Sequence, residues 1–214
     1  MPHPMIHLAV AKHILDNHPE IKKPEQFYLG SLAPDAVHFR EGFHRQMKKT
    51  SHLCVGDQPW GKNTNVGEWA DSALSYLAEH RDSQHIDLIR GYVAHTLLDN
   101  RWTTLWWTPF RLAHEAEIEA GTSTLHTECY EIDFQVYKAF PHTKAIMDQL
   151  IKSAGVDLPL VSAIEMERIR DHILYTQYCD RDDKDMDYNV ITLEDMWGFI
   201  ASESKTVSRW LHGV

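Results

Sequence analysis

Apolar residues recur along most of the chain at the three- and four-residue spacing of a helix, and no alternating strand pattern of useful length interrupts them. This spacing predicts helices over residues 5–17, 25–32, 66–80, 85–107, 124–140, 142–154, 162–178 and 192–212. Another helix is expected to begin at Pro34, because proline fits a first helical turn. Residues 40–63 are expected to be irregular. The pattern therefore predicts an all-α fold, a single-domain bundle of seven to nine helices spanning residues 1–214.

Two helix boundaries are predicted from local chemistry. Pro109 is expected to end the long helix that starts near residue 85, because proline lacks the amide proton that the helix interior requires. Thr192, followed by Glu194 and Asp195, is typical of a helix start, where a side-chain oxygen accepts a backbone hydrogen bond.

Length, charge and cysteine content narrow the class of protein. A chain of 214 residues with a net charge of −10 lacks the basic surface that nucleic acids and anionic membranes attract. Three scattered cysteines do not form a disulfide framework, which favours a reducing cytoplasm. The first residues lack the pattern of a signal peptide, and no apolar run reaches the length of a membrane span. We expect a cytoplasmic protein without a membrane anchor or stable nucleic-acid binding.

Histidine is unusually frequent, with 15 in the chain, and one of them shares a helix face with a carboxylate. His95 and Asp99 are four residues apart within an apolar run, so their side chains lie side by side on the predicted helix. Burying both is costly unless a partner such as a divalent metal satisfies them. With 31 acidic residues, about two such pairs would arise by chance, so this pair needs supporting ligands.

Four further residues could supply those ligands. His7 lies on the apolar face of the first predicted helix, Asp35 and His38 follow Pro34, and His52 lies in the irregular segment. Each also has an ordinary interpretation: a hydrogen-bonded core histidine for His7, a helix N-terminal carboxylate for Asp35, and a solvated loop residue for His52. Histidine nitrogens and carboxylate oxygens that converge from several elements are typical of catalytic metal sites.

These candidates lie in four sequence blocks whose order is more specific than any one block. The blocks are MIHLAVA from residue 5, LGSLAPDAVH from residue 29, KTSHL from residue 49 and GYVAHTLLD from residue 91. Together they resemble the zinc-dependent phospholipase C family, in particular its short cytoplasmic bacterial members described only as hydrolases. The resemblance covers residues 1–140 well and the C-terminal third weakly.

The resemblance implies an all-helical fold that binds clustered zinc ions and hydrolyses phosphoester bonds. It assigns a first metal site to Asp35, His52, His95 and Asp99, with Asp99 bridging to a second metal that His7 binds. It also makes Asp35 the candidate for orienting or deprotonating the attacking water, so Asp35 and Asp99 are the expected catalytic residues. Zinc is the expected metal, although manganese and iron also suit mixed histidine and carboxylate ligands.

The chain departs from the family at its remaining metal site. The family has a histidine six residues after the bridging aspartate, where this chain has Leu105. We therefore expect two metal ions rather than three. In secreted family members the N-terminal amine binds the second metal; here His3 is a candidate substitute. His38 is a candidate additional ligand or a partner of a ligand.

Other motifs carry less information. His114 begins like a metalloprotease motif, but Ile118 stands where the second histidine is required. The acidic segment 183–194 resembles a calcium loop, but Tyr188 replaces its glycine, so we interpret it as solvated. Trp60, Trp102 and Trp106 either line a site entrance or, as we favour, pack in the core.

The leading hypothesis from sequence is a di-zinc hydrolase acting on a small-molecule or lipid phosphoester. One alternative is a single-strand-type zinc nuclease, which the charge of −10 disfavours. The other is a non-catalytic helical scaffold or binding protein that retains a metal site. An open coordination position beside a pocket would favour catalysis over the scaffold.

Overall fold

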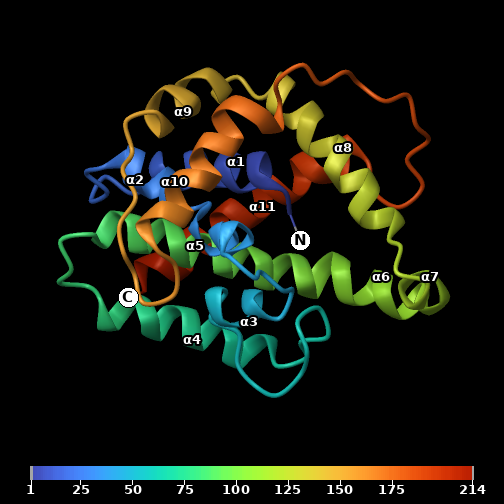
Figure 1. Ribbon diagram of the computed structural model, residues 1–214, viewed down its shortest axis with the longest axis horizontal. Helices are drawn as coiled ribbons and strands as arrows, with labels where there is room; N and C mark the ends of the chain where they lie inside the picture. Colours follow the sequence, from blue (N-terminus) through green and yellow to red (C-terminus); the bar gives the residue numbers. More distant parts are fainter. Residues whose placement is uncertain (1, 214) are drawn as a thin grey trace.

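The computed structural model describes residues 2–213, which fold into helices joined by loops, with no strand among them (Figure 1). The longer helices are α1 (Pro4–Leu15), α4 (Val66–Glu79), α5 (Ile86–Trp102), α8 (Thr124–Ala139), α9 (Thr143–Leu150), α10 (Ala163–His172) and α11 (Leu193–His212). Shorter ones are α2 (Pro24–Gly30), α3 (Met47–Ser51), α6 (Thr108–Ala113) and α7 (Glu115–Glu119), with a 3₁₀ turn η1 (Ala33–Phe39) and two π-helical turns, η2 (Thr103–Trp107) and η3 (Ile173–Gln177). The predicted all-α class is confirmed.

Helix α5 forms the centre of the bundle. It crosses the middle of the view in Figure 1 and packs against α1, α2, α4 and α11. Thirteen of its residues between Leu88 and Trp102 are buried, which explains why its sequence is apolar on nearly every face. The helix therefore places His95 and Asp99 in the interior rather than at the surface.

Helices α2 and α5 approach each other closely at two glycines. A Cβ atom on Gly91 would lie 2.1 Å from the carbonyl oxygen of Phe27, and one on Gly30 would lie 2.0 Å from the carbonyl oxygen of Leu88. Only glycine permits this approach, because backbone atoms of the partner helix occupy the space of a side chain. The crossing brings Ser31, at the end of α2, against His95.

The predicted end of the long helix at Pro109 is wrong. The chain continues through the π-helical turn η2 into α6, where Pro109 lies in the first turn. A π-helical turn pairs residues at a wider spacing, and a proline in a first turn has no amide partner to lose. Helical structure therefore extends to Ala113, beyond the predicted boundary.

The other boundaries largely agree with the sequence. Thr192 and Asp195 form the reciprocal capping box expected at the start of α11. The segment 40–63 is mostly irregular, as predicted, but it contains the short helix α3. None of the helices in residues 2–213 combines the length and apolar character that a membrane crossing requires.

Candidate metal centre

The five residues expected to bind metal converge on one point inside the bundle. They come from four elements: His7 from α1, Asp35 from η1, His52 from the end of α3, and both His95 and Asp99 from α5. His52 and Asp99 are completely buried, and His7 and His95 are each 2% exposed. Asp35 has the most accessible side chain of the set, at 18%.

Four distances between ligand atoms of these residues match the spacing of a tetrahedral coordination shell. His52 Nε2 is 3.4 Å from Asp35 Oδ1, 3.2 Å from Asp99 Oδ2 and 3.3 Å from His95 Nε2. His95 Nε2 is in turn 3.4 Å from Asp99 Oδ2. Ligand atoms about 2.0–2.1 Å from a tetrahedral metal lie about 3.3–3.4 Å apart. The four side chains could therefore hold a metal ion.

The second oxygen of Asp99 faces the remaining histidine. Asp99 Oδ1 lies 3.4 Å from His7 Nε2, and the His7 ring stacks on the His95 ring with centroids 3.8 Å apart. His7, His95 and Asp99 make a second group that could bind a metal. Asp99 thus contributes one oxygen to each group, as a bridging carboxylate does.

Hydrogen bonds outside the centre orient two of the imidazoles. His95 Nδ1 donates to the carbonyl oxygen of Ser31 at 2.8 Å. His52 Nδ1 lies 3.0 Å from Ser51 Oγ, whose own proton is directed to the carbonyl oxygen of Lys48. Both Nδ1 atoms therefore carry the proton of the neutral ring, and both Nε2 atoms present lone pairs to the centre.

The centre is poorly satisfied without a cation. Two Nε2 lone pairs 3.3 Å apart repel each other, so a proton or a metal ion must lie between His52 and His95. Both oxygens of Asp99 and both nitrogens of His7 are buried without a hydrogen-bond partner. Buried polar atoms are normally satisfied. The unsatisfied atoms here include both Asp99 oxygens and His7 Nε2, which a metal would use. The donor set fits a divalent metal.

The electrostatic state of the centre also suits a cation. Burial alone opposes ionisation of Asp99, but the neighbouring His95, His52 and His7 hold the pKa of its carboxyl well below the usual range. Burial lowers the pKa of His7 to about 4, so this imidazole is neutral near pH 7. Metal ligation requires an ionised carboxylate and an imidazole with a free lone pair.

Lys48 lies beside this centre, although the sequence analysis assigned it no role. Its Nζ is 2.6 Å from Asp35 Oδ1, and its side chain is almost fully buried. Burial opposes ionisation of Asp35, but the Lys48 ammonium and His52 hold the pKa of this carboxyl well below the usual range. The four-residue spacing between Lys48 and His52 is the signal that could have linked them.

A pocket of about 400 Å³ opens on Asp35. Its walls include the side chains of Arg45, Lys48 and Trp60 and of three histidines, His3, His38 and His126. His3 and His38 belong to neither metal-binding group, so the structure places them in the pocket wall instead. Trp60 packs 4.6 Å from the His52 ring, whereas Trp102 is fully buried and stacks with Trp106 in the core.

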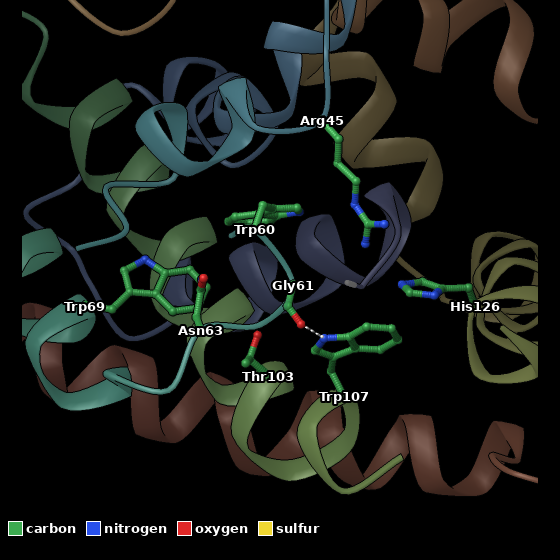
Figure 2. A pocket seen from close by; sticks show the side chains of 8 residues that line it. All are labelled: Arg45, Trp60, Gly61, Asn63, Trp69, Thr103, Trp107 and His126. Atoms are coloured by element: carbon green, nitrogen blue, oxygen red, sulfur yellow. Dashed lines mark hydrogen bonds between the residues drawn. The ribbon is translucent and has the colours of Figure 1, made fainter. Parts of the chain in front are cut away.

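A smaller cavity of about 20 Å³ adjoins this pocket and shares Arg45, Trp60 and His126 with it. Figure 2 shows the Arg45 side chain reaching down toward Trp107 and His126, while Trp107 Nε1 donates to the carbonyl oxygen of Gly61 at 2.6 Å. The space is enough for about one water molecule.

Leu105, at the position of the family's further histidine, is 44% exposed.

One more group that could hold a metal lies near the molecular surface, away from the centre, with one member buried and two exposed. It consists of His18, Glu20 and His212, with His18 Nδ1 at 2.6 Å and His212 Nδ1 at 4.0 Å from Glu20 Oε1. The sequence did not indicate this group, because its members come from opposite ends of the chain.

Comparison of the chain with protein-family models, with curated proteins and with solved structures found no match. The interpretation of the centre therefore rests on its own geometry.

The start of α1, which carries His7, is fixed by a buried carboxyl from α8. Asp133 Oδ1 accepts a hydrogen bond from the Ile6 amide at 3.0 Å, and Oδ2 accepts one from the Tyr178 hydroxyl at 2.7 Å. Complete burial raises the pKa of Asp133 from 3.8 to about 7, against the effect of those hydrogen bonds and of Arg181. The proton is therefore held more tightly in the folded protein than in the unfolded chain.

We expect this carboxyl to make stability fall as the pH rises. The raised pKa stabilises the folded protein fully below about pH 4, and this stabilisation is lost as the pH rises through 7. At 1.36 kcal/mol per pKa unit, the free energy of unfolding falls by at most about 4 kcal/mol. Asp133→Asn mimics the protonated carboxyl, so the variant should gain stability relative to the wild type between pH 5 and 8. Urea unfolding at several pH values measures this difference. A difference that stays constant would mean that Asp133 is ionised throughout, held by the Ile6 amide.

Proposed function

We propose that this protein is a metal-dependent hydrolase of phosphoester bonds, of the kind that the zinc-dependent phospholipase C family exemplifies. The observation that carries the proposal is the position of His52 Nε2, which lies 3.2–3.4 Å from atoms of Asp35, His95 and Asp99, with Asp99 reaching from His52 and His95 to His7. The same five residues carry the sequence resemblance. Two metal ions, with Asp99 between them, suit this arrangement.

An open approach to the centre supports catalysis over a purely structural site. Structural zinc sites are closed by protein ligands, whereas catalytic ones keep a position for water or substrate. Here the pocket of about 400 Å³ reaches Asp35, while the other four ligands are buried behind it. A substrate entering this pocket would meet the centre at Asp35.

Different residues of the centre can take different roles in hydrolysis. A bound zinc ion supplies a Lewis acid and makes water acidic enough to attack a phosphoester near neutral pH. Asp35, ionised and accessible from the pocket, can orient the attacking water and accept its proton as the oxygen–phosphorus bond forms. The bond between phosphorus and the ester oxygen breaks as the new bond forms, and the departing alcohol keeps that oxygen and takes a proton from solvent. Ser31 and Ser51 keep the two imidazoles in their metal-binding orientation.

The proposal is tested by measuring metal content and hydrolytic activity in the wild type and in a variant that lacks one proposed ligand. Wild-type protein purified without chelator is expected to contain about two metal ions per chain and to hydrolyse p-nitrophenyl phosphate or bis(p-nitrophenyl) phosphate. His95→Ala should lose most of the metal and at least 99% of the turnover, because His95 lies in both metal-binding groups.

His142→Ala is the matched control, since His142 is exposed at the start of α9 and far along the chain from every ligand. It should keep both the metal and the activity. A well-folded wild-type protein that takes up no stoichiometric metal after zinc addition would refute the proposal and favour the helical scaffold. Cleavage of single-stranded DNA alone would favour the nuclease.

A further inference from the structure

Lys48 has an environment that a lysine rarely adopts. The residue is 7% exposed, and lysine is almost never buried without a partner. The Nζ atom contacts Asp35 Oδ1 at 2.6 Å and lies 5.2 Å from the centre of the Trp60 ring. The ammonium thus stands between the metal centre and the wall of the pocket.

Asp35 cannot serve both of its partners fully. Its Oδ1 atom faces Lys48 Nζ and is also 3.4 Å from His52 Nε2, where it belongs to the metal-binding group. A cation at that group would take up the negative charge that Lys48 now faces. A buried ammonium then needs another anion, because an uncompensated buried charge is strongly unfavourable.

Within the part of the chain that the structure describes, the pocket wall carries two positive side chains but one negative side chain. Arg45 and Lys48 line it, and Asp35 is its one acidic wall residue among residues 2–213. The wall histidines add no charge near neutral pH, because burial lowers the pKa of His3 to about 3 and that of His126 to about 2. In a chain of net charge −10, this is a local concentration of positive charge.

Neutral hydrogen-bonding groups complete the surroundings. His3 Nε2 is buried without a hydrogen-bond partner, and the His38 ring lies in the same wall. The apolar surface comes from Pro2, Phe43 and Trp60. An anion with several oxygens, attached to a small organic group, matches these walls and a volume of about 400 Å³.

We infer that Lys48, together with Arg45, binds the non-bridging oxygens of a terminal phosphoryl group, so that the protein prefers phosphate monoesters over diesters. The inference rests on the proposed hydrolase function and specifies its substrate class. A monoester carries a phosphoryl group with charge near −2 and three free oxygens, enough to meet both cations as well as the centre. A diester carries one negative charge and two free oxygens, and its second ester group would have to occupy the space beside Lys48.

The test separates phosphate binding from metal binding. Variants Lys48→Met, Lys48→Arg and Arg45→Met are compared with Lys62→Met, which removes an exposed lysine that does not line the pocket. Metal content is measured by elemental analysis and binding of inorganic phosphate by calorimetry. Steady-state rates are measured with p-nitrophenyl phosphate and with bis(p-nitrophenyl) phosphate.

Lys48→Met is expected to keep its metal, to bind phosphate at least 10-fold more weakly and to raise KM for the monoester by at least 10-fold. Its KM for the diester should change less than threefold. Lys48→Arg should restore most of the phosphate affinity, and Lys62→Met should match the wild type. A merely structural lysine would alter both substrates alike.

Two failures are distinguishable. If wild-type protein binds metal and hydrolyses phosphoesters but Lys48→Met binds phosphate as tightly as the wild type, the role of Lys48 is refuted and the hydrolase function stands. If wild-type protein takes up no metal, the hydrolase function fails. The phosphate titration of metal-free Asp35→Asn, which removes the negative charge that Lys48 faces, still decides the anion site: binding that an added Lys48→Met abolishes supports it, and no binding overturns it.

Discussion

Gly91→Ala is expected to destabilise the protein by about 3 kcal/mol or more, the upper end of what overpacking costs. The added Cβ would lie 2.1 Å from the carbonyl oxygen of Phe27 and 2.9 Å from the amide nitrogen of Ser31. Both atoms belong to the backbone, so no flexible side chain can move aside. Helices α2 and α5 must separate, and the loss should appear as a lower midpoint of urea unfolding followed by circular dichroism.

Gly198→Ala is the matched control for this substitution. Gly198 also lies within a helix, α11, but nothing comes within 4 Å of a Cβ atom built there. Alanine should stabilise that helix by about 0.5–1 kcal/mol, because glycine has the poorer helix propensity. A similar change in both variants would show that the crossing of α2 and α5 adapts, contrary to the rigid contact described above.

The same crossing connects stability with the metal centre. The Ser31 carbonyl oxygen that accepts from His95 Nδ1 directly follows α2, and His95 lies one turn beyond Gly91 on α5. A displacement of α2 therefore alters the orientation of His95 as well as the packing of the core. Fold and candidate site depend on one helix contact.

The sequence predicted the helices well because their signals are local. The apolar spacing of α5 and the capping box at Thr192 each depend on residues within one or two turns. The boundary at Pro109 failed because η2 changes the hydrogen-bond spacing before the proline, and that change has no residue signature. Helix α3 is too short for periodicity to reveal.

The candidate site was predicted from two kinds of information. His95 and Asp99 follow from spacing on one helix, whereas His7, Asp35 and His52 were joined to them by the order of the four sequence blocks. Their convergence within 3.2–3.4 Å depends on how α1, η1 and α3 pack around α5, which residue spacing cannot predict. The ion pair of Lys48 with Asp35 and the surface group at His18 depend on the same packing and were not predicted.

Asp99→Asn is expected to lower metal affinity at least 100-fold and to remove the stabilisation that metal gives. Both carboxylate oxygens face imidazole nitrogens, at 3.4 Å for His7 and at 3.2 Å for His52. An amide has one oxygen and no charge, so it can serve at most one metal-binding group and must place its NH₂ toward the other. Substitutions of groups that only support ligands already cost 10–100-fold, and Asp99 is itself one of the proposed ligands.

The expected result appears as a change in the effect of a chelator on thermal stability. A metal present at 100 times its dissociation constant stabilises a protein by about 2.7 kcal/mol, or about 5–10 °C for a chain of this size. The melting temperature of the wild-type protein should fall by this amount when the chelator is added, and that of Asp99→Asn should hardly change. Differential scanning calorimetry with and without chelator measures both values.

Asp87→Asn distinguishes loss of metal from loss of a buried charge. Asp87 is a second buried carboxylate on α5, and it accepts hydrogen bonds from the Lys22 and Lys23 amides, each at 2.9 Å. Its replacement should destabilise the protein with and without metal by the same amount, which leaves the effect of the chelator unchanged. A chelator effect that survives in Asp99→Asn would place the stabilising metal elsewhere, and the surface group of His18, Glu20 and His212 would then be the first candidate.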